Sequence, residues 1–237
     1  MRLAAAIVAI GCASVSQAQT IVAADYVEPT DRYAHGILGD AIEHAGLRVT
    51  LSDGTQQGLS WPAQVVFEDT NPRLVDLDGD GAPEVIVVES HEDFGARLAV
   101  IGWDGQVLAH RAFTDFIGRT NRWLSVAGAA DMDGDGMVEI AYVDRPHLAK
   151  TLMVWRYVPL GDKVRLELVA TKGGLTNHKI GERDIGGGMR DCAVPEVVTA
   201  SADWTRVIAT RLENGALVSR DVGPHTGRAS LAAALDC

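Results

Sequence analysis

The apolar residues of this chain are grouped in short runs bounded by glycine, asparagine and aspartate. Residues 97–103 and 107–113 are two such runs, and they flank the dipeptide Asp104-Gly105. Dipeptides of this type accept the positive φ angles of a tight hairpin turn. After residue 18, no long segment repeats its apolar positions every 3.6 residues, as an amphipathic helix would. The pattern predicts an all-β fold of short strands.

Three sequence features recur in phase at intervals of about fifty residues. The first is a hairpin dipeptide, the second is a glutamate that opens an apolar run, and the third is a threonine followed by a turn residue. The dipeptides are Asp53-Gly54, Asp104-Gly105, Gly161-Asp162 and Asn214-Gly215; the glutamates are Glu84, Glu139 and Glu196; the threonines are Thr30, Thr70, Thr120, Thr176 and Thr226. Repeated units of four short strands are typical of β-propeller blades.

The repeat predicts a small β-propeller of four full blades plus terminal strands. The blades fall at about 30–69, 70–119, 120–175 and 176–225, and a closing segment follows at 226–237. We expect residues 227–235 to form a strand that closes the ring with residues 21–26; a four-bladed and a five-bladed ring both fit. A β-sandwich is the alternative fold, but sandwiches rarely show an internal period.

The first eighteen residues have the three parts of a secretory signal peptide. Arg2 supplies a positive start, residues 3–10 are a short apolar run, and Ser16-Gln17-Ala18 is a small-x-small cleavage site. We therefore expect an exported protein, periplasmic or secreted. Residues 9–12 loosely resemble a lipobox, so a lipid anchor on Cys12 is the alternative.

The charge of the chain limits its partners. Its formal net charge is −11, which repels nucleic acid and anionic membrane surfaces. No later segment approaches the roughly 20 apolar residues of a membrane-spanning helix. Because no linker interrupts the repeats, we expect residues 19–237 to form one propeller domain.

Two loops share the pattern D-x-D-G-D-G-x-x-E, at residues 76–84 and 131–139. Acids at the first, third and fifth positions of a tightly wound loop converge, and a carbonyl at the seventh position and a glutamate at the ninth complete an oxygen cage suited to calcium. A solvated turn is the alternative, but a second copy in the same phase disfavours it. We expect two structural calcium ions, held by Asp76, Asp78, Asp80, Ala82 and Glu84 and by Asp131, Asp133, Asp135, Met137 and Glu139.

On these loops the chain resembles the FG-GAP/VCBS repeat family, the propeller class that includes the N-terminal head of integrin α subunits. The resemblance covers nearly all of residues 20–237 and implies that the loop acids bind structural calcium. The layout is also similar to small exported bacterial VCBS-repeat proteins. The chain is shorter than the seven-bladed integrin pattern, which argues against integrin-like ligand binding.

The fourth unit lacks the metal-binding acids. Counting back from Glu196 with the same spacing gives Gly188, Arg190 and Cys192, so a positive charge stands where calcium would bind. In an oxidising compartment we expect Cys192 to form a disulfide with Cys237 and to replace the metal as the cross-link.

Basic and aromatic residues follow the repeat threonines. They are Arg32, Arg73, Arg122, Trp123, His178 and Arg228. Equivalent positions of a propeller converge on its axis, so these residues form a candidate site for an anionic or sugar ligand at one mouth of the channel. The alternative is that they pair with neighbouring acids.

No nucleophile, zinc, redox or phosphate-binding motif occurs in the chain. The sequence therefore favours a non-catalytic binding or scaffold module whose partner is an unidentified protein or glycan. The alternative is an extracytoplasmic lyase or hydrolase acting on a polyanionic or sugar substrate.

Overall fold

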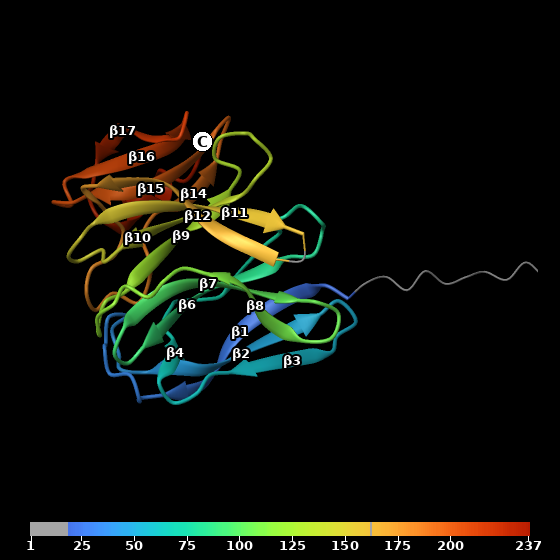
Figure 1. The fold of residues 1–237 in the computed structure, drawn as a ribbon. Coiled ribbons are helices and arrows are strands. Elements are labelled where there is room, and N and C mark those ends of the chain that lie inside the picture. Colours follow the sequence, from blue (N-terminus) through green and yellow to red (C-terminus); the bar gives the residue numbers. More distant parts are fainter. Residues whose placement is uncertain (1–18, 162) are drawn as a thin grey trace, which may run out of the picture.

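The computed structural model describes residues 19–161 and 163–237, which form three antiparallel β-sheets and one short helix (Figure 1). The predicted signal peptide and Cys12 lie outside the described residues, as does Asp162. The sheets follow one another in chain order through the molecule, from the blue-green N-terminal sheet to the red C-terminal sheet.

The first sheet contains eight strands in the order β1-β2-β4-β6-β7-β8. β3 pairs with β2, and β5 pairs with β6 in line with β4. The first two sequence units are therefore joined in one sheet, through β4. The strands are β1 (Ile21–Thr30), β2 (Glu43–Leu51), β3 (Gln56–Ser60), β4 (Val65–Phe67), β5 (Arg73–Val75), β6 (Glu84–His91), β7 (Gly95–Trp103) and β8 (Leu108–Phe113).

The second and third sheets each correspond to one sequence unit. The second has the order β12-β11-β10-β9, and in the third β13 and β14 share one side of β15, followed by β16 and β17. The strands are β9 (Leu124–Ala130), β10 (Glu139–Asp144), β11 (Thr151–Leu160), β12 (Lys163–Gly173), β13 (Leu175–Thr176), β14 (Gly188–Asp191), β15 (Pro195–Ser201), β16 (Arg206–Glu213) and β17 (Ala216–Pro224).

The hairpin dipeptides connect the strands that the sequence predicted. Asp53-Gly54 joins β2 to β3, Asp104-Gly105 joins β7 to β8, and Asn214-Gly215 joins β16 to β17. The glycines of all three turns have positive φ angles, between 75° and 94°. Gly161 lies between β11 and β12 in the same way.

The strands that open with a glutamate lie in the middle of their sheets and are buried on both faces. Every residue of β10 is buried, and in β6 only the last residue is partly exposed. One apolar cluster joins the first sheet to the second and includes Val88, Val100 and Ile140. Another joins the second sheet to the third and includes Val143 and Val197. This all-β arrangement is β-propeller-like, as the sequence predicted.

The closing strand predicted at 227–235 is wrong, because this segment forms helix α1 (Arg228–Ala233). Its alanines and leucine have high helix propensity, and Leu231 and Ala234 lie three residues apart and so share one helix face. Both pack against Val198, Ala200 and Val207 of the third sheet. The expected ring closure by residues 21–26 is also wrong, since β1 pairs with β2.

The disulfide predicted from the sequence is present between Cys192 and Cys237, whose Cα atoms are 5.8 Å apart. It fastens the end of the chain to the residue that follows β14. Arg190 adds a second link, because its Nη1 donates to the carbonyl of Ala234 at 2.8 Å. Two links therefore tie the C-terminal end of the helix to the third sheet.

Within residues 19–161 and 163–237, no helix has the length and apolar character needed to cross a membrane.

Replacing both cysteines by serine should lower the free energy of unfolding. The disulfide closes a loop with a sequence separation of 45, for which chain-entropy estimates give about 4 kcal/mol before any strain. Urea unfolding of wild type and Cys192→Ser/Cys237→Ser, each with and without reductant, measures the difference. Equal midpoints in the oxidised wild type and the double variant would contradict this role.

Candidate functional site

The loop between β5 and β6 folds around the carboxylate of Asp76. Its Oδ1 accepts the backbone N–H of Gly79 at 2.8 Å, and its Oδ2 accepts that of Gly81 at 3.0 Å. Both glycines have positive φ angles, 77° and 85°, which side chains disfavour. The buried side chain of Leu77 anchors the loop in the core.

The loop between β9 and β10 repeats this geometry. Asp131 accepts the N–H groups of Gly134 at 2.7 Å and Gly136 at 2.9 Å, and Met132 is the buried anchor. In both loops the ninth-position glutamate accepts the N–H of the second residue: Glu84 from Leu77 at 3.0 Å and Glu139 from Met132 at 2.8 Å.

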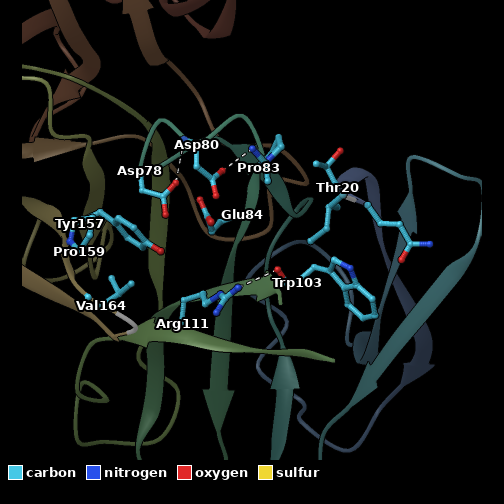
Figure 2. Close-up of a pocket in the computed structure, with 14 residues that line it drawn as sticks. Thr20, Asp78, Asp80, Pro83, Glu84, Trp103, Arg111, Tyr157, Pro159 and Val164 are labelled. Carbon is cyan, nitrogen blue, oxygen red and sulfur yellow. Dashed lines mark hydrogen bonds between the residues drawn. The ribbon is translucent and has the colours of Figure 1, made fainter. Parts of the chain in front are cut away.

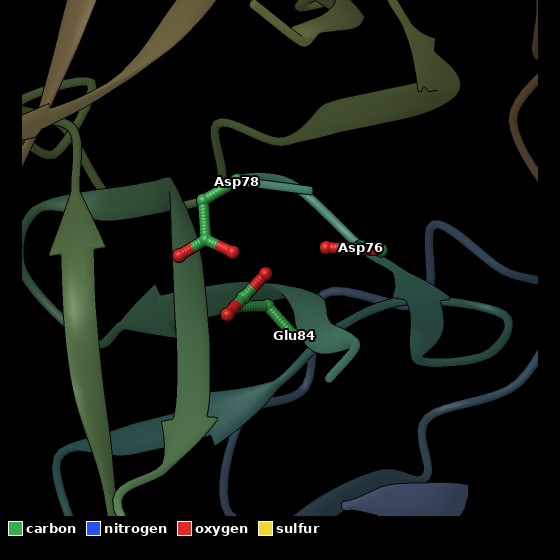
Figure 3. Close-up of side chains that lie close together, drawn as sticks. All are labelled: Asp76, Asp78 and Glu84. Carbon is green, nitrogen blue, oxygen red and sulfur yellow. The ribbon is translucent and has the colours of Figure 1, made fainter. Parts of the chain in front are cut away.

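Each loop brings three carboxylates together. Asp76, Asp78 and Glu84 each place an oxygen within 4.8 Å of the others (Figure 3), and Asp131, Asp133 and Glu139 do the same. Oxygens that share one calcium ion at 2.3–2.6 Å can be at most about 5 Å apart, so both groups fit a calcium ion. Asp80 and Asp135 lie outside these three-membered groups.

The first acidic loop borders a cavity of about 160 Å³ (Figure 2). Asp78, Asp80 and Glu84 lie on one side of it, and Arg111 and Tyr157 lie across from them. Burial raises the pKa of Glu84 to about 7. An uncompensated carboxylate at this position is therefore costly, and a cation beside it would favour its charged form.

An arginine distinguishes the second loop from the first. The guanidinium of Arg156, on β11, lies 2.5 Å from an oxygen of Asp133, 2.9 Å from one of Asp135 and 2.5 Å from one of Glu139. Arg156 lies opposite Glu139 in the pairing of β10 with β11. In the first sheet, the register of β6 with β7 puts Gly102 at the corresponding position opposite Glu84. Arg111 fills that space instead, because a Cβ at Gly102 would lie 2.7 Å from its Cγ.

Arg111 does not neutralise the first loop in the same way. Its Nη2 donates to the carbonyl of Trp103 at 2.9 Å, and it forms no ion pair with an acid among the described residues. The second loop thus carries a resident cation of its own, and the first loop does not.

In the third sheet the corresponding glutamate, Glu196, is paired with two arginines. Arg190 on β14 is buried and donates its Nε to Oε2 of Glu196 at 2.9 Å, and Arg220 donates to the same carboxylate at 2.8 Å. These hydrogen bonds lower the pKa of Glu196. A guanidinium thus lies beside this glutamate, as the sequence predicted. The predicted equivalence of Arg190 with the second loop acid is wrong, because Arg190 pairs with Glu196 in the sheet as Val75 pairs with Glu84, so this loop is shorter than the acidic loops.

Residues 76–142 match the model of a protein family described as an FG-GAP-like repeat. The match begins at Asp76, spans both acidic loops and ends within β10. The chain therefore carries an FG-GAP-like repeat. This confirms the resemblance to FG-GAP/VCBS repeats that the two acidic loops indicated. No curated protein with which the sequence was compared gives a significant match.

The predicted basic site is only partly assembled. Arg73 pairs with Asp69, and Arg228 pairs with Glu182 at 3.0 Å, so both have structural partners. Arg32 donates to main-chain carbonyls, including that of Pro62 at 3.0 Å. Of the six candidates, only Arg122 and Trp123 line a common cavity, which we call the basic pocket.

The basic pocket has a volume of about 200 Å³. Besides Arg122 and Trp123 it is lined by His35, Arg145 and His147, and by the aliphatic residues Ile37, Leu148 and Ile180. His178, a predicted member, lies behind it and contacts Nε2 of His147 through Nδ1 at 3.1 Å. Arg145 and His147 directly follow β10 and were not predicted from the sequence. The predicted residues all follow a repeat threonine, and these two do not.

Buried acids lie beneath this pocket. Glu68 accepts a hydrogen bond from Nδ1 of His35 at 2.6 Å, and its backbone carbonyl accepts the indole N–H of Trp123 at 2.7 Å. Glu43 is 2% exposed, and its Oε1 has no hydrogen-bond partner among the described residues. Burial, with further contributions from the charges of Glu68, Asp40 and Asp69, raises the pKa of Glu43 to about 9.

Replacing Glu43 by glutamine should flatten the dependence of stability on pH. The folded state holds the Glu43 proton up to about pH 9, whereas the unfolded chain releases it near its ordinary pKa of about 4.3. Stability is therefore lost as pH rises through this window, by at most about 1.4 kcal/mol per pH unit. Urea unfolding of wild type and Glu43→Gln from pH 5 to 8, in chelator, should show the variant gaining relative stability.

The exposed Glu92→Gln variant serves as the matched control, since it removes the same charge at the surface. If Glu43→Gln and wild type lose stability in parallel over this range, Glu43 does not hold a proton in the folded state.

Proposed function

We propose that this protein is an exported β-propeller-like module, braced by calcium, that acts by binding a ligand and not by catalysis. The observation that best supports this proposal is that three carboxylates converge in each of two loops, with nearly the same geometry. Export is supported by the N-terminal sequence and by the Cys192–Cys237 disulfide, a bond that persists in oxidising compartments.

Calcium suits these loops because every side-chain ligand in them is a carboxylate oxygen. Calcium accepts six to eight oxygen ligands in flexible geometry, whereas zinc sites favour nitrogen and sulfur. Asp76, Asp78, Asp80 and Glu84 would hold one ion, with the carbonyl of Ala82; Asp131, Asp133, Asp135 and Glu139 would hold the second, with the carbonyl of Met137. Each ion would fasten the end of one strand to the start of the next.

The basic pocket supports binding more than catalysis. Its polar lining consists of arginine, histidine and asparagine, and no carboxylate of the described residues lines it. The enzyme alternative requires an acid and a base that converge on the substrate. His147 and His178 are instead bonded to each other, and burial lowers the pKa of His147 to about 4.

Calcium should raise the melting temperature of the mature protein. A calcium ion that binds only the folded state raises the free energy of unfolding by about 2.7 kcal/mol per site when its free concentration is a hundred times Kd. Thermal melts in calcium and in chelator test this, and the rise should be lost in Asp78→Ala/Asp133→Ala. The control Asp93→Ala/Asp115→Ala removes two exposed acids outside the loops and should keep the response. Identical melting temperatures of wild type in calcium and chelator would refute the proposal.

The two loops should bind calcium with different affinities, because calcium must displace the guanidinium of Arg156 from the second loop only. In an Asp78→Ala background, where the second loop alone reports, Arg156→Gln should tighten calcium binding by about tenfold or more. Isothermal titration measures the affinity.

In an Asp133→Ala background, Arg111→Gln should change the affinity of the first loop much less, since Arg111 is not ion-paired with the loop. Unchanged affinity of the second loop in Arg156→Gln would show that Arg156 does not compete with the ion.

A further inference from the structure

The positive charge of the basic pocket is only partly paired with acids. Arg122 donates to the carbonyl of its neighbour Asn121 at 2.8 Å and forms no ion pair with any residue that the structure describes. Arg145 pairs with Asp144 through Nε and Nη2, which leaves its Nη1 without an acid. Two guanidinium groups thus line one cavity in a chain whose net charge is −11.

His147, which lines the pocket, and His178, which contacts it, are both neutral. Nε2 of His178 contacts the carbonyl of Glu182 at 2.8 Å and must donate to it. Nδ1 of the neutral His178 then accepts from Nε2 of His147. Burial lowers the pKa of both rings, so this chain of donors holds both neutral. His35, the other histidine of the lining, is already bonded to the buried Glu68, so charge recognition in the pocket falls to the arginines.

Part of the pocket lining is aliphatic. Leu148 is 63% exposed and Ile180 is 70% exposed, and both line the cavity with the buried Ile37. Covering such side chains with apolar ligand surface is favourable by about 25 cal/mol per Å². The volume of about 200 Å³ exceeds that of a cavity of about 150 Å³ known to hold benzene, so a single ring with a short acidic arm fits.

We infer that the basic pocket binds a small organic carboxylate, with the carboxylate on Arg122 and Arg145 and an apolar body against Leu148, Ile180 and Ile37. This inference rests on the proposed binding function and names its ligand class. The pocket is separate from the acidic loops, because Trp123 precedes β9 and Asp131 follows it. A strand of this length spans roughly 20 Å.

Phenylacetate is the probe for a direct test, by isothermal titration of calcium-saturated protein at fixed ionic strength. Phenylacetamide keeps the ring without the charge, and inorganic phosphate keeps the charge without the ring. We expect phenylacetate to bind at least about tenfold more tightly than either. Equal binding of phenylacetate and phenylacetamide would overturn the role of the arginines, and tighter binding of galacturonate than of phenylacetate would overturn the apolar body.

Two variants locate the site. Arg122→Ala should weaken phenylacetate binding by about tenfold, whereas Arg119→Ala, which removes an exposed arginine outside the pocket, should not change it. Leu148→Ser/Ile180→Ser should also weaken binding without unfolding the protein, since both side chains are exposed. An unchanged affinity in Arg122→Ala would refute the assignment.

The result is distinguishable from failure of the proposed function. Calcium stabilisation without phenylacetate binding would overturn the ligand class and leave the calcium-braced module standing. Phenylacetate binding without any calcium effect would support the pocket and refute the calcium brace.

Discussion

The structure depends on how it neutralises one buried carboxylate in each of its last three units. Glu84, Glu139 and Glu196 stand at the start of the central strand of their sheets and are at most 6% exposed. Burying a charged carboxylate without a partner costs several kcal/mol. Each glutamate therefore needs either a cation close by or a bound proton, and the three units differ in the cation that the structure places beside it.

The three solutions form a graded series along the chain. At Glu84 no arginine among the described residues pairs with the carboxylate, which lies in a group of three acids that could hold a metal ion. At Glu139 the guanidinium of Arg156 reaches the same carboxylates that would bind the ion. At Glu196 the buried Arg190 is a covalently tethered cation that no ion can replace without breaking a buried pair. A side-chain guanidinium does not have to be taken up from solution, so no entropy is lost in binding an ion. Unlike an ion, however, it cannot be removed from the folded protein.

The last solution also explains how the fold ends. Arg190 binds both Glu196 and the carbonyl of Ala234, so the residue that pairs with the buried glutamate also holds the terminal helix. The Cys192–Cys237 disulfide starts from the turn between β14 and β15 and ties the same helix to the same sheet. A helix of six residues is marginal alone in water, and its packing on the third sheet with these two links keeps it in place.

Sequence reasoning found the features that are encoded locally. Residues close together in the sequence determine the hairpin at Asp104-Gly105 and the loop that begins at Asp76. The spacing of these residues in the sequence was therefore enough to predict both structures. The helix at Leu231 was missed because a short apolar run is compatible with a strand or a helix, and only its packing partners decide. Arg156 was missed for a related reason: it lies seventeen residues from Glu139 in the chain, and only the register of β11 against β10 brings them together.

The basic pocket illustrates the limit of repeat-based reasoning. Equivalent positions in a repeat reach equivalent places only where the units have equivalent neighbours. Arg122 lines a cavity because the segment that contains His35 and Ile37 lies against the second sheet, where Asn121 donates to the hydroxyl of Tyr33 at 3.2 Å. Arg228 stands at the corresponding position but opens the terminal helix and pairs with Glu182. The N-terminal segment thus makes one of five similar positions into a pocket. At the other positions Arg73 and Arg228 form ion pairs, and Arg32 and His178 bond to main-chain carbonyls.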